Sequence, residues 1–356
     1  MNWLEGEEVQ KKLLAITHSG KPEMRLYFRK ANCSGLSFKA LMVMECEFED
    51  IQFEGCNLED TMFSDCKFIR CSFNDANLQN ATFFKTPMTD CTAVKARGYR
   101  WSVLQSAVNN LDASDAALPE AKFIQSPMKD VNLTRANLDN AGMPLSAQTR
   151  TNFTGAYLKQ TILFNIDLRT CIFLGANASF TVFSSSIIDG MNFSNMNLTH
   201  AQFSKSQLKN TNFSGSQLMG ACFTDSILSD AQLNHCNMVN TTFMRCNLNG
   251  AKLDQSIFNN AQSTRSTFVK ASLVGLEASR SVWHHADLQA ADCRKAVFNQ
   301  ADLIGSNLTD ANFEGSSLYE TRLDLTNQTG TKFDFSAFAT TRPPDKNYAA
   351  FVMANS

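Results

Sequence analysis

The side chains best suited to catalysis or metal binding are scattered along this sequence. It contains no HExxH, no GxSxG, no glycine-rich phosphate loop and no CxxC pair. Its histidines show no spacing typical of a zinc or iron site. They are His18, His200, His235, His284 and His285. We therefore expect no enzyme activity, no cofactor and no bound metal ion.

Eight carboxylates lie between residues 45 and 65, a stretch that contains no Lys or Arg. Such a run could mimic the phosphates of DNA, or it could be an ordinary solvated face. We favour the solvated face because the net charge of the 356 residues is only −2. This acidic run, a candidate binding feature, consists of Glu45, Glu47, Glu49, Asp50, Glu54, Glu59, Asp60 and Asp65.

The elements that position these residues are set by a repeat of five. Between residues 191 and 258 every fifth residue, the centre, is large and apolar, and from Ala201 on a small residue lies two positions before each centre. A period of five fits neither the helical period of 3.6 nor the strand period of 2, so a repeat architecture is indicated. The phase is unbroken from Phe28 to Phe338. The centres that are not apolar are Gly98, Gln148, Ser263 and Gln328.

Several segments resemble the A(D/N)LXX unit of the bacterial pentapeptide repeat family. They include Ala76-Asn77-Leu78, Ala136-Asn137-Leu138 and Ala301-Asp302-Leu303. The resemblance covers roughly residues 28–338. It implies an all-β fold, a right-handed four-sided parallel β-helix with one pentapeptide per side and four pentapeptides per coil. It implies no single function, because the family includes topoisomerase-protecting proteins and secreted effectors.

We expect three segments: a helical cap over residues 1–22, the β-helix over 23–338 and a C-terminal tail over 339–356. The cap helix would begin after Asn2. Within the β-helix we expect an irregular or looped coil at about 84–120, because Trp101 stands where a small residue belongs, and a loop at 142–150 around Gln148. Trp101 is a candidate binding residue, since loops on a rigid scaffold often carry function. Ser263 should lie inside, beneath Trp283.

A second candidate binding feature depends on the implied coil of four pentapeptides, which places residues 205, 225, 245, 265 and 285 at one corner. This basic column could bind an acidic protein surface or a phosphate-bearing ligand, or be screened by water and salt. It consists of Lys205, Asp225, Arg245, Arg265 and His285.

Most of the 11 cysteines occupy the small position of the repeat, which suggests core filler. In the implied fold, Cys46 and Cys66 lie on adjacent coils, as do Cys71 and Cys91, close enough for disulfides. We expect reduced thiols, because no signal peptide is recognisable and the chain reads as cytoplasmic.

Taken together, the sequence favours a non-catalytic rigid solenoid for protein–protein interaction, a scaffold or adaptor in a bacterial cytoplasm. One alternative is a DNA-mimicking protector or inhibitor of type II topoisomerase. Another is a secretion-system effector or its delivery adaptor, so secretion stays open. We expect a protein partner, no direct nucleic-acid binding and no membrane association, with a homodimer through the C-terminal tail as an option.

Overall fold

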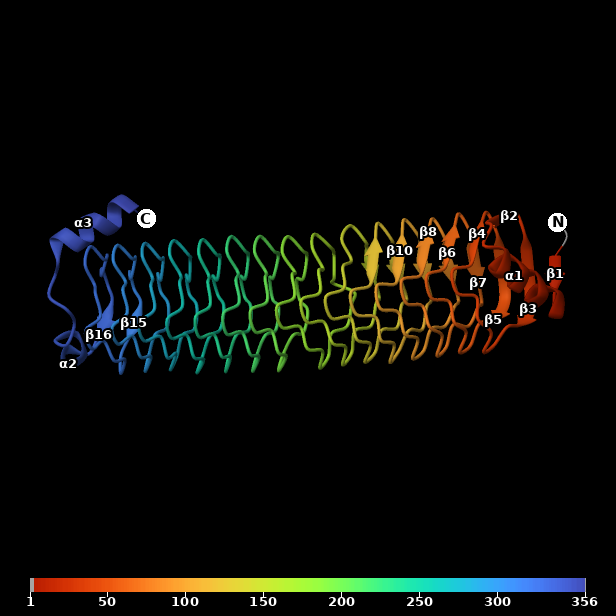
Figure 1. The fold of residues 1–356 in the computed structure, drawn as a ribbon. Helices are drawn as coiled ribbons and strands as arrows, with labels where there is room; N and C mark the ends of the chain where they lie inside the picture. Colours follow the sequence, from red (N-terminus) through yellow and green to blue (C-terminus); the bar gives the residue numbers. More distant parts are fainter. Residues whose placement is uncertain (1–2, 356) are drawn as a thin grey trace. The chain divides into compact units, whose positions relative to one another are not determined.

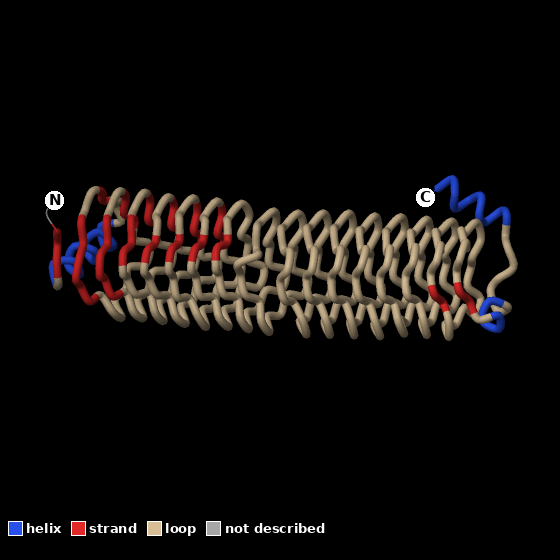
Figure 2. The backbone as a smooth tube through the Cα atoms, turned by 180° about the vertical axis from the view of Figure 1, so that it is seen from behind, coloured by secondary structure: helices blue, strands red, loops and turns tan. Residues whose placement is uncertain are grey.

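The computed structural model describes residues 3–355, which form two compact units divided after Ala178. Each unit is a stack of coils in which parallel pairing joins residues 20 apart (Figures 1 and 2). The coil length therefore equals four pentapeptides, as the resemblance implies.

The first unit contains most of the extended strands. The long sheet has the order β1-β3-β5-β7-β9-β11-β13-β14 and a second sheet has the order β12-β10-β8-β6-β4-β2. The elements are β1 (Trp3–Glu5), α1 (Glu7–Ser19), β2 (Glu23–Met24), β3 (Tyr27–Asn32), β4 (Met42–Met44), β5 (Glu47–Gln52), β6 (Met62–Ser64), β7 (Lys67–Ile69), β8 (Thr82–Phe84), β9 (Met88–Thr89), β10 (Ser102–Leu104), β11 (Val108–Asn109), β12 (Lys122–Ile124), β13 (Met128–Lys129) and β14 (Gln148–Thr149).

Two further sides of each coil pair through single parallel bridges, such as Ser37 with Asn57 and Gln52 with Ser72. Four ladders per coil confirm the predicted four-sided parallel β-helix. In the second unit the same single bridges predominate, and the named elements are β15 (Asn312–Phe313), β16 (Lys332–Phe333), α2 (Phe335–Phe338) and α3 (Lys346–Asn355). The repeat was predicted to reach residue 338, but its last four residues form α2.

The corners explain why the period is five. Asp50, Arg70 and Asp90, two residues past a centre, have φ values of 54°, 50° and 55°, in the left-handed region. The same conformation recurs at residues two past a centre in both units, many of them Asn, Asp or Gly. These residue types tolerate a positive φ best, so each pentapeptide can end in a turn that starts the next side.

The centres form the core of each unit. Phe203 stacks on Phe223 with ring centroids 4.9 Å apart and the planes at 6°, and both side chains are fully buried. Such stacking follows from the strand spacing, because identical rings on neighbouring coils lie one above the other. Ser263 is also fully buried, as predicted.

The small position contributes hydrogen bonds as well as space. The Ser226 hydroxyl donates to the carbonyl of Phe203 at 2.6 Å, and the Cys246 thiol donates to the carbonyl of Phe223 at 2.8 Å. A small donor therefore satisfies a buried carbonyl of the preceding coil. Burial raises the pKa of the Cys236 thiol to about 12, as expected for core filler rather than a nucleophile.

The predicted irregular coil at 84–120 is wrong, because β8 to β13 keep the regular coil-to-coil register through it. Trp101 fits inside because residue 98, a centre, has no side chain. A Cβ at Gly98 would lie 2.7 Å from Cδ2 of Leu118 and 3.1 Å from Cβ of Trp101. The indole therefore fills the core, where it meets Phe83 at 5.5 Å and Phe123 at 5.8 Å edge to face.

The predicted loop at 142–150 is wrong as well. Gln148 is buried and belongs to β14, which pairs with β13. Its amide finds partners inside: Nε2 donates to the Ser146 carbonyl at 3.2 Å, and Oε1 accepts from the Thr151 hydroxyl at 3.0 Å. A buried polar centre is tolerated when its hydrogen bonds are made.

The N-terminal helix exists but begins later than predicted. Residues 3–5 form β1, which pairs with β3 and places Leu4 beside Phe28, and α1 then runs from Glu7 to Ser19. Asn2, the predicted cap, lies outside the described residues. Val9 and Leu13 of α1 are buried, and α1 contacts both β1 and β3. A helix over the first coil suits a cap, which remains our interpretation of this segment.

Candidate functional site

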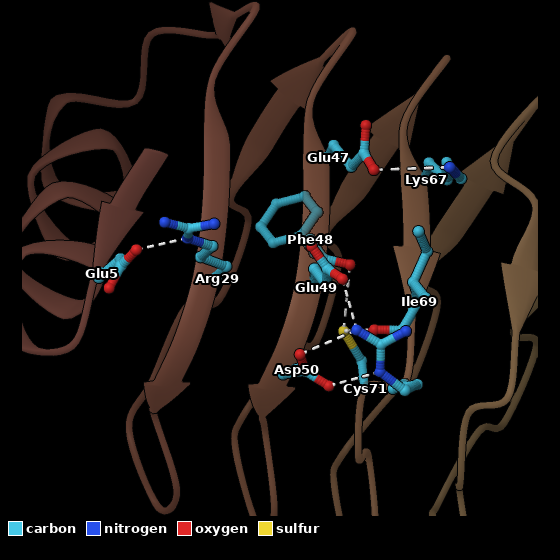
Figure 3. Close-up of polar contacts among 10 residues, drawn as sticks. Glu5, Arg29, Glu47, Phe48, Glu49, Asp50, Lys67, Ile69 and Cys71 are labelled. Carbon is cyan, nitrogen blue, oxygen red and sulfur yellow. Dashed lines mark hydrogen bonds and ion pairs between the residues drawn. The ribbon is translucent and has the colours of Figure 1, made fainter. Parts of the chain in front are cut away.

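The acidic run is not a bare acidic surface. Its carboxylates pair with cations one coil away, which the sequence count within residues 45–65 could not reveal. Glu47 lies 3.5 Å from Nζ of Lys67, and the two side chains point toward each other (Figure 3). Asp50 lies 2.7 Å from Nε of Arg70. The Arg70 hydrogen bond lowers the pKa of Asp50.

The other members of the run are also engaged. Further ion pairs join Glu45 to Arg25 at 2.8 Å, Glu49 to Arg70, Glu59 to Lys39 at 2.9 Å and Asp60 to Lys39 at 3.9 Å. Hydroxyl groups donate to the remaining two, from Ser72 to Glu54 at 3.0 Å and from Ser64 to Asp65 at 2.8 Å. A DNA mimic needs a continuous negative potential. These ion pairs and hydrogen bonds weaken that potential, because they engage the carboxylates that would produce it.

The basic column is mixed in the same way. Arg245 donates two hydrogen bonds to Asp225, at 2.6 and 3.0 Å, which lower the pKa of that carboxyl. Lys205 and Arg265 are exposed at this corner. The His285 ring lies over Gly305, and its pKa is lowered by burial and then by Arg265 and His284. Anion binding at this column stays a prediction.

Trp101 faces the core and is fully buried, so it cannot contact a partner of the folded protein. This corrects its assignment as a binding residue. Within residues 3–355 no group of three or more His, Cys, Asp or Glu side chains is placed to hold a metal ion.

A different surface stands out in the first unit. On the sheet β12-β10-β8-β6-β4-β2, and on the two coils that follow it in sequence, the residue after each centre is apolar with a single exception, Ser64. Because side chains alternate along a strand, these residues face away from the core that their centres fill. We call this column the apolar ladder. It consists of Met24, Met44, Phe84, Leu104, Ile124, Pro144 and Phe164.

The ladder is exposed enough to be bound. Met24 is 50% exposed and Phe164 42%, and the members between them are half-buried against their neighbours. Parallel sheets are normally covered on both faces, and apolar side chains on an outer face are the usual sign of a covering element. The apolar column is contiguous from Phe84 to Phe164, which makes this face a candidate binding surface.

The column beside the ladder is small or polar in its middle, at Thr82, Ser102, Lys122 and Gly142. This difference in size leaves a depression next to the ladder. A hollow of about 530 Å³ is lined by Glu120, Lys122, Ile124, Asn140, Gly142, Pro144 and Ile162.

The rims of this face are polar and largely self-neutralised. Arg25 pairs with Glu45 on one rim, and Arg100 pairs with Glu120 at 2.8 Å on the other. Lys85 holds its ammonium 5.3 Å from the centre of the Phe84 ring. An apolar centre inside a polar rim is the usual anatomy of a protein–protein interface.

Sequence reasoning missed the ladder because the basic column was the one set of outward positions that was followed from coil to coil. The signal was present: residues 84, 104, 124, 144 and 164 are all apolar at intervals of 20, whereas the equivalent residues 184, 204, 224 and 264 are Ser or Thr and Met244 is the apolar member of that later series.

Comparison with known proteins supports the repeat. A model of the pentapeptide repeat region matches residues 146–223, and a model of eight pentapeptide repeats matches residues 46–83, 226–261, 246–281 and 284–327. The chain belongs to the pentapeptide repeat family. These models describe repeats and indicate no catalytic family. No curated protein matches this pentapeptide repeat protein.

Solved structures resemble it in fold alone. Trypsin-treated QnrB1, a plasmid-mediated fluoroquinolone resistance protein, is 20% identical with a TM-score of 0.30, over 56% of this chain and 92% of that one. HetL, involved in heterocyst differentiation regulation in the cyanobacterium Nostoc, is 17% identical with a TM-score of 0.19, over 87% and 95%. No helix in the described part of the chain is long and apolar enough to cross a membrane.

Proposed function

We propose that this pentapeptide repeat protein is a non-catalytic scaffold or adaptor that binds a protein partner through the apolar ladder, in a bacterial cytoplasm. The observation that carries the proposal is the ladder itself, an outward apolar column with polar rims on a face built from paired strands. Each coil is hydrogen-bonded to its neighbours, so the ladder side chains are held in a fixed spacing. Preorganisation of this kind favours binding, because little conformational entropy is lost.

The topoisomerase alternative receives less support from the same geometry. Cations one coil away pair with the acidic run, and Arg70 alone engages both Glu49 and Asp50. We therefore expect the purified protein to leave supercoiling by DNA gyrase unchanged at low salt. A dose-dependent effect that disappears in the variant Glu49→Gln, Glu54→Gln, Glu59→Gln would replace our proposal with the DNA-mimic function.

The proposal is tested with three immobilised full-length proteins: the wild type, the ladder variant Phe84→Glu with Leu104→Glu, and a control. The control, Ser114→Glu with Thr134→Glu, adds the same charge on another side of the coils. Partners from the native host are identified by mass spectrometry, purified, and measured by calorimetry against all three proteins. Thermal unfolding checks that the variants are folded.

We expect a purified partner to bind the wild type and the control, and to lose binding to the ladder variant. Equal binding to all three proteins would contradict the role of the ladder. Equal loss in both variants would show that added charge, rather than the ladder, decides the interaction.

A further inference from the structure

We infer that the apolar ladder takes the apolar side of an amphipathic α-helix that belongs to a protein partner. This inference rests on the proposed function and specifies the partner's contacting element. Four observations support it: the contacts of a helix of this chain with the equivalent columns in the second unit, the backbone of the sheet, and the width and the charge of the face.

The helix α3 docks on the last coils of the second unit (Figure 1). Asp345 caps it, because the backbone N–H groups of Asn347 and Tyr348 both donate to its carboxylate at 3.1 Å. The N–H of Asp345 itself donates to Asp324 at 2.7 Å. Arg322 lies 3.9 Å from the centre of the Tyr348 ring, and the interaction of the Tyr348 hydroxyl with the Asp302 carboxylate acts to lower the pKa of that carboxyl.

These contacts lie on the same columns of the repeat as the ladder and its neighbour. Ile304 follows a centre, as Phe164 does. The two residues are a whole number of 20-residue coils apart in the sequence, so they occupy the same column of the repeat. Ile304 is nevertheless fully buried. Because Asp302 and Arg322 on the neighbouring column contact Tyr348, and Val352 is 5% exposed, we infer that α3 covers Ile304. The outer face of this repeat is therefore compatible with a packed helix.

The backbone beneath the ladder offers nothing to an extended peptide. β8 is paired with β6 on one side and β10 on the other, and the Leu104 carbonyl accepts the N–H of Lys85 at 2.9 Å. A segment bound on this face meets side chains alone, so its own N–H and C=O groups must be satisfied within itself. A helix meets this condition, whereas a single extended strand does not.

The ladder also has the width of one helix. Large apolar side chains form one column from Phe84 to Phe164, whereas the neighbouring column is small or polar from Thr82 to Gly142 and ends in the apolar Ile162. A helix buries a single apolar stripe, whereas a second sheet would need both columns to be large. Four coil spacings of about 4.8 Å give about 19 Å, the length of about 13 helical residues.

The charge of the rims disfavours strongly charged occupants. Arg25 with Glu45 and Arg100 with Glu120 already neutralise each other, so neither a polyanion nor a polycation finds a complementary field. A helix with an apolar side and mixed charges elsewhere needs no such field.

The probes are two labelled peptides of about 14 residues, matched in length to the ladder. They share one composition of Leu, Lys and Glu. In the first peptide Leu follows the helical spacing i, i+3, i+4 and i+7, and in the second it occupies alternate positions. Fluorescence anisotropy measures each against the full-length wild type, the variant Leu104→Glu with Ile124→Glu, and the control Ser114→Glu with Thr134→Glu.

We expect the first peptide to bind the wild type and the control, to become helical on binding, and to bind the ladder variant at least about ten-fold more weakly, because each introduced carboxylate would lose water on contact. The second peptide should not compete. Three results would overturn the inference that a helix binds the ladder. They are equal binding of the two peptides, no binding of either peptide, and equal affinity of the first peptide for the wild type and the ladder variant.

Analytical ultracentrifugation of the wild type tests the other occupant, a second copy of this chain. A dimer that the ladder variant dissolves would assign the ladder to self-association and overturn the inference. The inference about the helix can fail while the proposed function holds. This would be the result if a purified partner needs the ladder for binding but the first peptide does not bind.

Discussion

The indole of Trp101 occupies core space that a side chain at residue 98 would need. Gly98 is the one glycine among the centres, and a Cβ there would lie 3.1 Å from the Trp101 Cβ and 2.7 Å from the Leu118 side chain. A similar exchange of sizes joins Leu111, at a small position, to Ala113, at a centre, and both are buried. The repeat therefore conserves the volume of a coil more strictly than the residue type at each position.

This relationship predicts a non-additive pair of substitutions. Trp101→Ala should lower the free energy of unfolding by about 3–5 kcal/mol through cavity formation, and Gly98→Leu by about 1–3 kcal/mol or more through overpacking. The double variant restores the usual large centre and small partner, so its loss should be smaller than the sum of the two. Chemical denaturation of the three proteins measures the coupling. Additive losses would show that the two positions do not share space.

The stacked phenylalanines of the second unit predict a strong contrast between inward and outward positions. Phe203→Ala should cost about 3–5 kcal/mol, because the ring is fully buried and stacks on Phe223. Lys209→Ala, at an exposed position, should change stability by less than about 0.5 kcal/mol. The midpoint of thermal unfolding reports the difference. Equal shifts in the two proteins would be incompatible with the inward assignment of the centres.

Cys222 should be the thiol that reacts first in the native protein. It is half-buried, whereas the other ten cysteines are buried. Burial acts to raise its pKa, but hydrogen bonds from Ser204 and Thr224 outweigh that effect, so the pKa is lowered overall. Since the thiolate is the nucleophile, alkylation should proceed at a lower pH than for an ordinary thiol, and Cys222→Ser should abolish it. Mass mapping that placed the label at Cys236, whose pKa is about 12, would refute this.

Deletion of residues 1–20 should cause aggregation rather than give a well-behaved shorter protein. The deletion removes β1 and α1, which exposes the edge of β3 and the apolar residues that Val9, Leu13 and Ile16 now cover. Light scattering of the purified truncation checks this. A monomeric truncation with cooperative unfolding would mean that this segment is not a cap.

The residues that face the core were predictable from the sequence. The unbroken period of five, together with the family resemblance, indicated the centres, the small positions and the coil of four pentapeptides. It could do so because a corner with positive φ recurs every fifth residue and leaves the same two positions facing inward. Ser263 could be placed inside on this basis. The sequence did not predict that Trp101, beside Gly98, and Gln148 would fit inside the core. The core accepts them because of the side chain or hydrogen-bond partner that lies across it.

The candidate site was decided by the tertiary structure. The carboxylates of residues 45–65 look unpaired along the chain, but stacking brings Arg70 to Asp50 and Lys39 to Glu59, each from the adjacent coil. The same stacking turns Phe84, Leu104 and Ile124, each unremarkable in its own pentapeptide, into one apolar surface. The pentapeptide that contains an outward residue holds no packing partner for it, so the residue type at that position is not constrained locally. The neighbours that give it a role lie on other coils, at the strand spacing of about 4.8 Å.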